Sequence, residues 1–375
     1  MNQSRWWTDE SELKQRLDTA REPKQLPGPL LDGALSEWQR TQRRDLSLVG
    51  KPGSASSAAR MRARGFVEQQ LAWPADSSAL HPQPLSRHVH DDYVEEQALF
   101  TTTAPMRAPA TVLVPRGVSG PCPGIVALHD MGGFRLFGRQ KLLAFDGEPE
   151  CLTAFRQQHY HGASIMADLV RRGYVVVAID QLCFGERTMA AADDPVGFRQ
   201  RRLEMDAEAA QEFTAGVSRQ DEPFLVRQVM TVGRTWPGLV VADDRRTVDY
   251  LCSRPEVDPT RIGCIGLSFG AYRANYLGAL DDRIKAAVSV CWTSTMDGLV
   301  GYNVGGAMGW FSLIPGMFER MDLPDLQALT APRAFMAING WHDHLVQPFG
   351  IAKAHLHLRE SFTLAGCPEQ LGSLL

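Results

Sequence analysis

Residues 261–270 read RIGCIGLSFG, and residues 271–280 read AYRANYLGAL. The first run predicts a strand, the second predicts a helix, and the Gly-x-Ser-x-Gly between them is typical of a sharp strand-to-helix turn. Such a turn lifts the Ser268 hydroxyl above the sheet at the helix N-terminus, where the helix dipole and the N–H of Phe269 can stabilise a negative oxygen. The stretch therefore predicts that Ser268 is a nucleophile; the alternative is an ordinary turn capped by a serine.

Apolar runs that end in polar residues or glycine flank this stretch on both sides. They predict strands at residues 93–102, 110–115, 124–129, 174–180, 261–267, 286–291 and 333–339. Helices are expected at residues 163–172, 241–253, 270–280 and 349–365. The first two strands suit an antiparallel pair, and the remaining apolar strands, which alternate with helices, indicate a parallel sheet buried on both faces. We therefore expect an α/β fold with a mostly parallel central sheet, helices on both faces, and ligands at the carboxyl ends of the strands.

The beginning of the chain differs in composition from the rest. It holds two amphipathic stretches, 11–19 and 34–44, and turn-rich segments such as PKQLPGP and GKPGSASSAAR. Its basic runs, RTQRRD and ARMRARG, suit a solvated helix face or a linker better than a nucleic-acid arm. We expect an N-terminal helical and irregular extension at residues 1–90, followed by a catalytic α/β domain at residues 91–375. Two insertions interrupt this domain, near residues 134–161 and 187–236.

The composition of the 375 residues excludes several classes of protein. Apolar residues make up 44% and charged residues 22%, so the chain can bury a sizeable core. The net charge of -4 favours neither nucleic-acid nor membrane-surface binding, and no run approaches the roughly 20 apolar residues of a membrane-spanning helix. The N-terminus has no apolar segment of the kind found in signal peptides. Seven scattered cysteines without a C-x-x-C pair predict reduced thiols in a cytoplasmic protein.

A second candidate loop reads His129-Asp130-Met131-Gly132-Gly133 and follows the apolar run GIVAL. A glycine-rich loop at this place can present a second backbone N–H to a developing oxyanion, and that of Met131 is the best candidate. For His129 we favour a structural role, in which it forms a hydrogen bond within this loop, over proton transfer.

A third candidate loop, residues 340–344, reads GWHDH and directly follows the strand predicted at 333–339. A carboxylate here would orient a catalytic histidine and stabilise its charged form, which makes Asp343 the candidate acid and Asp297 the reserve. The alternative for Asp343 is a carboxylate at the start of the next helix. Adjacent residues rarely chelate one ion and no further ligand cluster is visible, so no metal site is expected.

These stretches resemble the α/β-hydrolase superfamily. Four further stretches carry the same resemblance: RRGYVVVAIDQLCFGER, DRRTVDYLCSRPEVDPTRIGCIGLSFG, LDDRIKAAVSV and LPDLQALTAPRAFMAINGWHDHLVQP. The chain is most similar to the dienelactone-hydrolase-like and acetyl-xylan-esterase-like branch. The resemblance implies hydrolysis of a carboxylic ester through an acyl-enzyme, with Ser268 as nucleophile and without metal or organic cofactor. Dienelactone hydrolases carry cysteine at the turn, and Asp130 stands where such loops commonly have glycine.

The resemblance also implies a histidine after Asp343, on a loop that follows one further strand. Only His344, His355 and His357 come after Asp343; His344 adjoins the acid, and the other two lie two residues apart in a predicted helix, where we expect one to face solvent and the other the sheet. We expect that the chain lacks the last strand and the closing helix, which would impair activity and leave an open sheet edge prone to homo-oligomerisation.

Another histidine could instead complete the triad, and His129, His159 and His161 are the candidates. Aromatic, histidine and arginine residues in the two insertions suit a moderately polar substrate, such as an acetylated sugar or another small carboxylic ester. We expect Glu186 and Arg187 to form a structural ion pair beside the site. The alternatives in function are a peptidase or thioesterase on the same fold, or a binding protein without catalysis.

Overall fold

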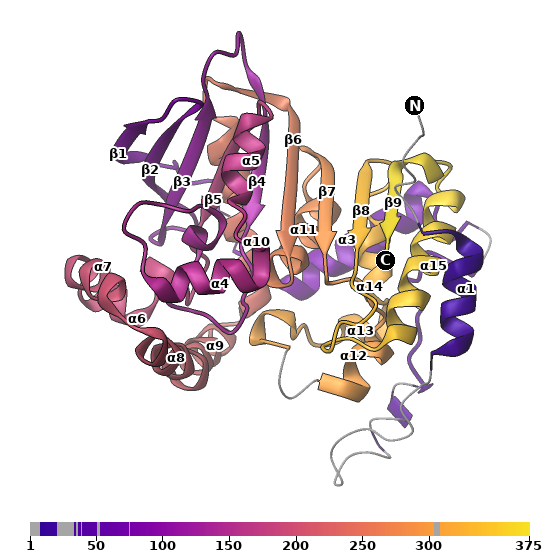
Figure 1. Cartoon of the computed structure of the whole chain (residues 1–375). Helices are drawn as coiled ribbons and strands as arrows, with labels where there is room; N and C mark the ends of the chain where they lie inside the picture. The colour runs from indigo at the N-terminus through magenta and orange to yellow at the C-terminus, as the bar shows by residue number, and fades with distance from the viewer. Residues whose placement is uncertain are drawn as a thin grey trace. The chain divides into compact units, whose positions relative to one another are not determined.

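The computed structural model describes residues 8–20, 34, 37–38, 40–50, 53–74, 76–303 and 308–375, with side chains left out at 300–303. Contacts divide the chain into two compact units, residues 73–273 and residues 1–72 with 274–375. Figure 1 shows the elements of both. The division at residue 90 that the sequence suggested remains a prediction.

The sheet of residues 73–273 has six strands in the order β1-β2-β3-β5-β4-β6 (Figure 1). Their bounds are β1 Gln83–Val89, β2 Tyr93–Thr101, β3 Arg107–Pro115, β4 Cys122–Leu128, β5 Val175–Ile179 and β6 Val257–Leu267. The pairs β1–β2, β2–β3 and β3–β5 are antiparallel, and β4 runs parallel to both β5 and β6. The predicted antiparallel pair and the parallel strands after it are thus confirmed, whereas β1 lies in a stretch expected to be helical or irregular.

Helices cover both faces of this sheet. Ala127 on β4 packs in one apolar cluster with Ala167 and Val170 of α5. A β-carbon on Gly124, three residues earlier and therefore on the opposite face, would touch Leu251 of α10. Short apolar strands buried on both faces form this arrangement because neither face meets water. The bounds are α4 Glu150–Tyr160, α5 Ile165–Arg171, α6 Met189–Asp193, α7 Pro195–Glu204, α8 Ala207–Gly216, α9 Glu222–Thr231, α10 Trp236–Cys252 and α11 Phe269–Leu280, with short turns η1 Arg139–Leu142, η2 Gly185–Arg187 and η3 Val217–Asp221.

The two predicted insertions share an apolar cluster of their own. Phe134, Phe137 and Phe155 of the first insertion pack with Phe198 and Ala210 of the second. Phe134 stacks on Phe155 with the ring centroids 4.9 Å apart. The segment that follows β4 and the helices that follow β5 are therefore held together by side-chain packing.

The other unit contains three parallel strands in the order β7-β8-β9. Its elements are α1 Glu10–Thr19, α3 Ser57–Leu71, β7 Ile284–Val290, α12 Met296–Asn303, α13 Met317–Arg320, α14 Leu323–Ala328, β8 Ala334–Ile338, α15 Pro348–Leu364 and β9 Leu371–Leu374, with short turns η4 Trp310–Ser312 and η5 Pro368–Gln370. β9 follows the last long helix and pairs with β8, Phe335 lying opposite Leu371. The expectation that this strand is missing was therefore wrong, because four residues suffice for a strand that is paired along its length.

The beginning of the chain packs within this second unit. The N–H of Thr8 donates to the carbonyl of Ser373 at 2.5 Å, and the N–H of Leu375 donates to the Thr8 hydroxyl at 2.9 Å. Residues 57–71, expected to be linker or a solvated helix face, form a helix in which Val67 and Leu71 are fully buried. Of the helix expected at 34–44, residues 34, 37, 38 and 40 are helical, and residues 35, 36 and 39 lie outside the described residues.

Candidate active site

Ser268 occupies the turn between β6 and α11, as the sequence predicted. Its φ of +55° lies in the left-handed region, which a residue with a side chain adopts only under constraint from its surroundings. The N–H of Tyr272 donates to the Ser268 carbonyl at 2.9 Å and so begins the first turn of the helix. Ser268 is half-buried, and within the described parts of the chain its hydroxyl has no hydrogen-bond partner. The hydroxyl is therefore available to a substrate or a base.

Two glycines make this turn possible because the backbone passes very close to itself. A β-carbon on Gly266 would lie 2.2 Å from the carbonyl carbon of Gly270. A β-carbon on Gly270 would lie 2.0 Å from the carbonyl oxygen of Leu128, the last residue of β4. The N-terminus of α11 thus lies directly against the end of β4. The loop that follows β4 is therefore placed next to Ser268.

His129 is a structural histidine in this loop, which confirms the favoured interpretation. Its Nδ1 lies 2.9 Å from the carbonyl oxygen of Asp130, and its Nε2 accepts the N–H of Gln181 at 3.2 Å. Burial, with smaller effects from Arg273 and Lys141, holds the pKa of His129 well below its usual range. A neutral ring whose two nitrogens are both hydrogen-bonded cannot also accept the serine proton. His129 is therefore excluded as general base.

The two predicted oxyanion donors lie on either side of the contact between β4 and α11. Phe269 is the first residue of α11, so its N–H lies at the positive end of the helix dipole. Met131 is half-buried, and its N–H donates no hydrogen bond in the described part of the chain. The roles of Met131 and Phe269 in an oxyanion hole remain predictions that this geometry supports.

Two residues that the sequence pattern did not reveal, Lys141 and Tyr160, form hydrogen bonds to the 129–133 loop. Lys141 donates to the carbonyl oxygens of Asp130 and Met131, both at 2.9 Å. The Tyr160 hydroxyl donates to the Asp130 carboxylate at 2.6 Å, and burial together with this carboxylate raises the pKa of Tyr160 well above its usual range. The sequence marks Lys141 only as a single lysine in the otherwise apolar run KLLAF.

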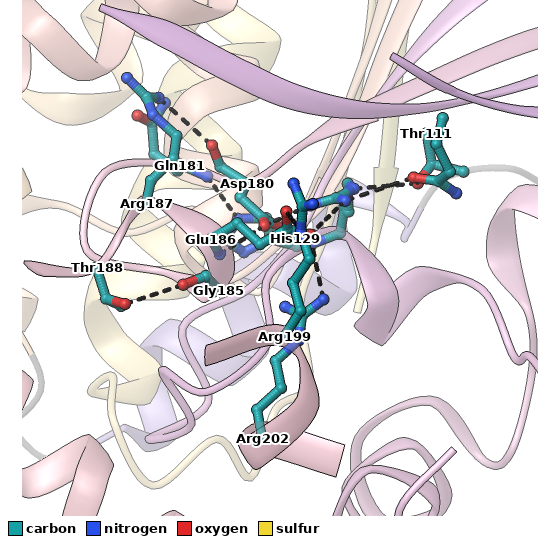
Figure 2. Close-up of polar contacts among 12 residues, drawn as sticks. Thr111, His129, Asp180, Gln181, Gly185, Glu186, Arg187, Thr188, Arg199 and Arg202 are labelled. Carbon is teal, nitrogen blue, oxygen red and sulfur yellow. Dashed lines mark hydrogen bonds and ion pairs between the residues drawn. The ribbon is translucent and has the colours of Figure 1, made fainter. Parts of the chain in front are cut away.

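The loop after β5 carries a buried ion cluster, shown in Figure 2. Arg139 pairs with Asp180 and, at 2.8 Å, with Glu186, which also binds Arg202 at 3.1 Å. Burial alone would raise the pKa of Glu186, but the charges of Arg139 and Arg202 lower it to about 2. Glu186 therefore stays ionised and fixes this loop.

The expected ion pair between Glu186 and Arg187 was wrong. Arg187, which Figure 2 shows beside this cluster, binds Asp243 of α10 at 2.5 Å instead. Adjacent side chains in the short η2 turn point in different directions, so each reaches a different partner. Glu186 and Arg187 are therefore each held in a structural ion pair, but with other partners than each other.

Asp343 follows β8, in the 274–375 part of the chain. It is half-buried, and its Oδ1 accepts the N–H of Leu345 at 2.9 Å. It does not cap α15, which begins at Pro348 without a side-chain cap. The reserve acid, Asp297, lies 3.3 Å from the ammonium of Lys353. The geometry leaves Asp343 as the predicted acid and ties Asp297 to an ion pair.

The histidines of α15 are both engaged inside their own unit. His355 is fully buried, with Nδ1 2.6 Å from the Ser373 hydroxyl and Nε2 3.0 Å from Oδ1 of Asn339. Burial lowers the pKa of His355 to about 3, so the ring is neutral and cannot serve as the base. His357 was expected to face solvent if His355 faced the sheet, but it is largely buried against the Asp325 carboxylate, 2.6 Å away.

Three further candidate histidines are exposed. His159 stacks against Phe155 with the ring centroids 4.3 Å apart, and partial burial lowers its pKa. His161 ends α4 in the left-handed conformation, and His344 adjoins Asp343.

Across the described ranges no three His, Cys, Asp or Glu side chains gather as metal ligands would. None of the helices in the described part combines the length and apolarity needed to cross a bilayer.

Comparisons with known proteins agree with this geometry. Residues 245–311, which include the Ser268 turn, match the family model "BAAT / Acyl-CoA thioester hydrolase C terminal". The chain is 25% identical to "Putative hydrolase YtaP" of Bacillus subtilis (strain 168) over 294 residues, 78% of this chain and 85% of that protein.

Solved structures share the fold. One is the "putative acetyl xylan esterase" of Bacteroides fragilis NCTC 9343, with a TM-score of 0.68 and 17% identity over 92% of this chain and 81% of that one. Another is a glucuronoyl esterase from Solibacter usitatus, with a TM-score of 0.56 and 17% identity over 86% of this chain and 85% of that one. The strand order, the serine turn and these likenesses confirm the expected fold: the chain has the α/β-hydrolase fold.

Proposed function

We propose that the protein is a serine hydrolase that cleaves carboxylic esters through an acyl-enzyme. The observation that carries the proposal is the strained Ser268 turn, whose hydroxyl is available beside the loop that carries Met131. Strain of this kind persists where the surroundings impose it, and it is common at catalytic nucleophiles. The hydrolase and esterase names of the relatives support the same chemistry.

In the proposed reaction the Ser268 oxygen attacks the ester carbonyl carbon and passes its proton to a general base. The N–H groups of Met131 and Phe269 bind the negative oxygen of the tetrahedral intermediate. The intermediate collapses by breaking the carbon–oxygen bond to the alcohol, which takes the proton from the base. Water then attacks the acyl-enzyme by the same route and releases the acid. Asp343 would orient the base.

The geometry narrows the choice of base. His129 and His355 are excluded because each is buried with both ring nitrogens hydrogen-bonded. The exposed His159, His161 and His344 remain as candidates. Replacing each by glutamine, which preserves size and polarity, identifies the base as the variant in which ester turnover collapses while the folded state is retained.

For the substrate we propose an acetyl ester or another small polar carboxylic ester. The support is the likeness to proteins named "putative acetyl xylan esterase" and "glucuronoyl esterase", both of which are named for the hydrolysis of esters. A series of p-nitrophenyl esters from acetate to decanoate measures the acyl preference. We expect kcat/KM to be highest for acetate and to fall as the chain lengthens.

The deciding experiment compares p-nitrophenyl acetate hydrolysis by the protein, Ser268→Ala and Ser86→Ala. Ser86 lies on β1 and is a matched control for the loss of one hydroxyl. We expect turnover in the protein and in the control, and background rates in Ser268→Ala. Equal background rates in all three, with no labelling of Ser268 by a fluorophosphonate, would refute the proposal and favour a ligand-binding protein.

A second candidate function is hydrolysis of a thioester. It is favoured by the family model whose match spans the Ser268 turn, because that model is named for acyl-CoA thioester hydrolases. Acetyl-CoA and p-nitrophenyl acetate carry the same acyl group, so their kcat/KM values compare the two leaving groups directly. A preference for acetyl-CoA of more than tenfold would replace the ester proposal with this one.

We infer further that the protein functions in the cytoplasm, and the seven cysteines support this. No disulfide joins any of them in the described structure, and Cys122, Cys183, Cys264 and Cys367 are buried as thiols. Alkylation by iodoacetamide in a fresh denatured lysate, without reductant, should modify all seven. Resistance of a pair to alkylation would indicate a disulfide and an oxidising compartment.

A further inference from the structure

Lys141 is a fully buried cation directly below the loop that carries Met131. It lies in the short η1 turn, and none of its surface reaches solvent. Its ammonium donates to the carbonyl oxygens of Asp130 and Met131, both at 2.9 Å. Lysine is among the residues least often buried. A fully buried lysine that donates hydrogen bonds to two loop carbonyls therefore indicates a specific role for this side chain.

The two carbonyls determine where the Met131 N–H points. A trans peptide is planar, and its C=O and N–H point in opposite directions. The carbonyl of Asp130 is held by the Lys141 ammonium and lies 2.9 Å from Nδ1 of His129, so the N–H of Met131 is directed away from both. The carbonyl of Met131 accepts from Lys141 and from the N–H of Phe134 at 3.0 Å, which fixes the next peptide as well.

The surroundings of Lys141 keep it in one place. Its ammonium lies 4.9 Å from the ring centroid of Phe155 and 5.1 Å from that of Phe184, and 3.9 Å from the Asp130 carboxylate. Burial lowers the pKa of Lys141 to about 8, so at neutral pH it is still mainly charged. A fixed positive charge beside the loop would also favour a negative oxygen bound at the Met131 N–H.

We propose that Lys141 is a positioning residue of the oxyanion hole: by holding the carbonyls of Asp130 and Met131, it aims the N–H of Met131 at the oxyanion formed above Ser268. This inference rests on the proposed function. It predicts that Lys141 acts in the transition state and contributes little to binding of the uncharged substrate.

The test compares Lys141→Met with Tyr160→Phe. Methionine fills similar space without a donor, and Tyr160→Phe removes a hydrogen bond to the same residue, Asp130, while leaving both loop carbonyls bound to Lys141. With p-nitrophenyl acetate we expect Lys141→Met to lower kcat by about 10²–10³, the range for one lost oxyanion donor, with KM changed less than threefold. In Tyr160→Phe both should stay within about fivefold of the unmodified protein.

Phenylboronic acid, which forms a tetrahedral adduct with an active serine, separates positioning from mere loss of folded protein. If Lys141→Met only lowered the fraction of active protein, the inhibition constant of the boronic acid would not move. Under the proposal it rises by about the same factor as kcat/KM falls. An active protein whose Lys141→Met variant keeps kcat and the inhibition constant within threefold overturns the inference and leaves the proposed function standing.

Amide exchange tests the inference independently of turnover. The N–H of Phe134 reports on the loop because it donates to the Met131 carbonyl that Lys141 holds. We expect its exchange to be at least tenfold faster in Lys141→Met than in Tyr160→Phe. If the protein shows no turnover and Ser268 is not labelled, the proposed function fails; faster exchange would then still support the holding of the loop, and unchanged exchange would overturn it.

Discussion

Replacing Gly270 by alanine should separate the N-terminus of α11 from the end of β4. The new β-carbon would lie 2.0 Å from the Leu128 carbonyl oxygen and 3.1 Å from that of His129. Ordinary contact begins near 3.4 Å, so the two backbones must move apart by about 1.4 Å, the difference between 3.4 and 2.0. Neither neighbour is a flexible side chain. We therefore expect the free energy of unfolding to fall by about 3 kcal/mol, the upper end for an overfilled core.

The same displacement should reach the chemistry. The Leu128 carbonyl belongs to the strand that leads into Met131, so a shift of this size misaligns the Met131 N–H with that of Phe269. Loss of one oxyanion donor lowers kcat by about 10²–10³. Urea unfolding measures the first effect, and ester turnover with the rate of fluorophosphonate labelling of Ser268 measures the second.

Gly216→Ala is the matched control, because a β-carbon there meets nothing within 4 Å and the residue is helical. It should raise the free energy of unfolding by about 0.5–1 kcal/mol and leave labelling unchanged. The reasoning is refuted if Gly270→Ala unfolds within about 0.5 kcal/mol of the unmodified protein and labels Ser268 at the same rate.

Four further predictions concern stability and assembly. Arg139→Met leaves the buried carboxylates of Asp180 and Glu186 without the cation they share, so urea unfolding should show a loss of about 3–5 kcal/mol; a loss below 1 kcal/mol would contradict this. The pKa of Glu186 is lowered from 4.5 to about 2, so its contribution of about 3 kcal/mol is complete above pH 4.5 and lost as the pH falls toward 2; Glu186→Gln should remove this acid dependence. The pKa of His355 is lowered from 6.5 to about 3, so the unfolded chain binds the proton first and stability should fall by about 4–5 kcal/mol between those pH values; a flat profile down to pH 4 would show that the ring is not held neutral. We still expect a homo-oligomer, now through β1, which ends its sheet and is exposed along most of its length; light scattering should show Leu85→Lys shifting it toward monomer, and an unmodified protein that is monomeric throughout would end this expectation.

The parallel strands could be predicted because strands that are buried on both faces consist of continuous apolar residues. β5, for example, is VVVAI and is buried throughout. β1 could not be predicted in this way: it contains Pro84, and six of its seven residues are exposed, so no apolar pattern marks it. β9 has only four residues and includes Gly372, and its pairing with β8 depends on tertiary structure.

The site divides along a similar line. The Ser268 turn could be predicted from its glycines, because a sharp turn and a close backbone approach leave a direct mark on the sequence. Lys141 could not, because the groups it binds are backbone carbonyls, which every residue has. His357 was misjudged because its partner, Asp325, lies on another helix, and helical periodicity says nothing about what packs against a face.

The pairing of Thr8 with β9 bears on how the chain folds as it is made. Residues 73–273 are contiguous, so that unit can fold as soon as its last strand has left the ribosome. The other unit is split, and its first 72 residues must wait for some 300 more before β9 has been made. At roughly 5–20 residues per second the wait lasts about 15–60 s. During that time Leu13 of α1 and Val67 and Leu71 of α3 lack the cover that they have in the folded protein, so we expect chaperones that bind nascent chains to hold this segment.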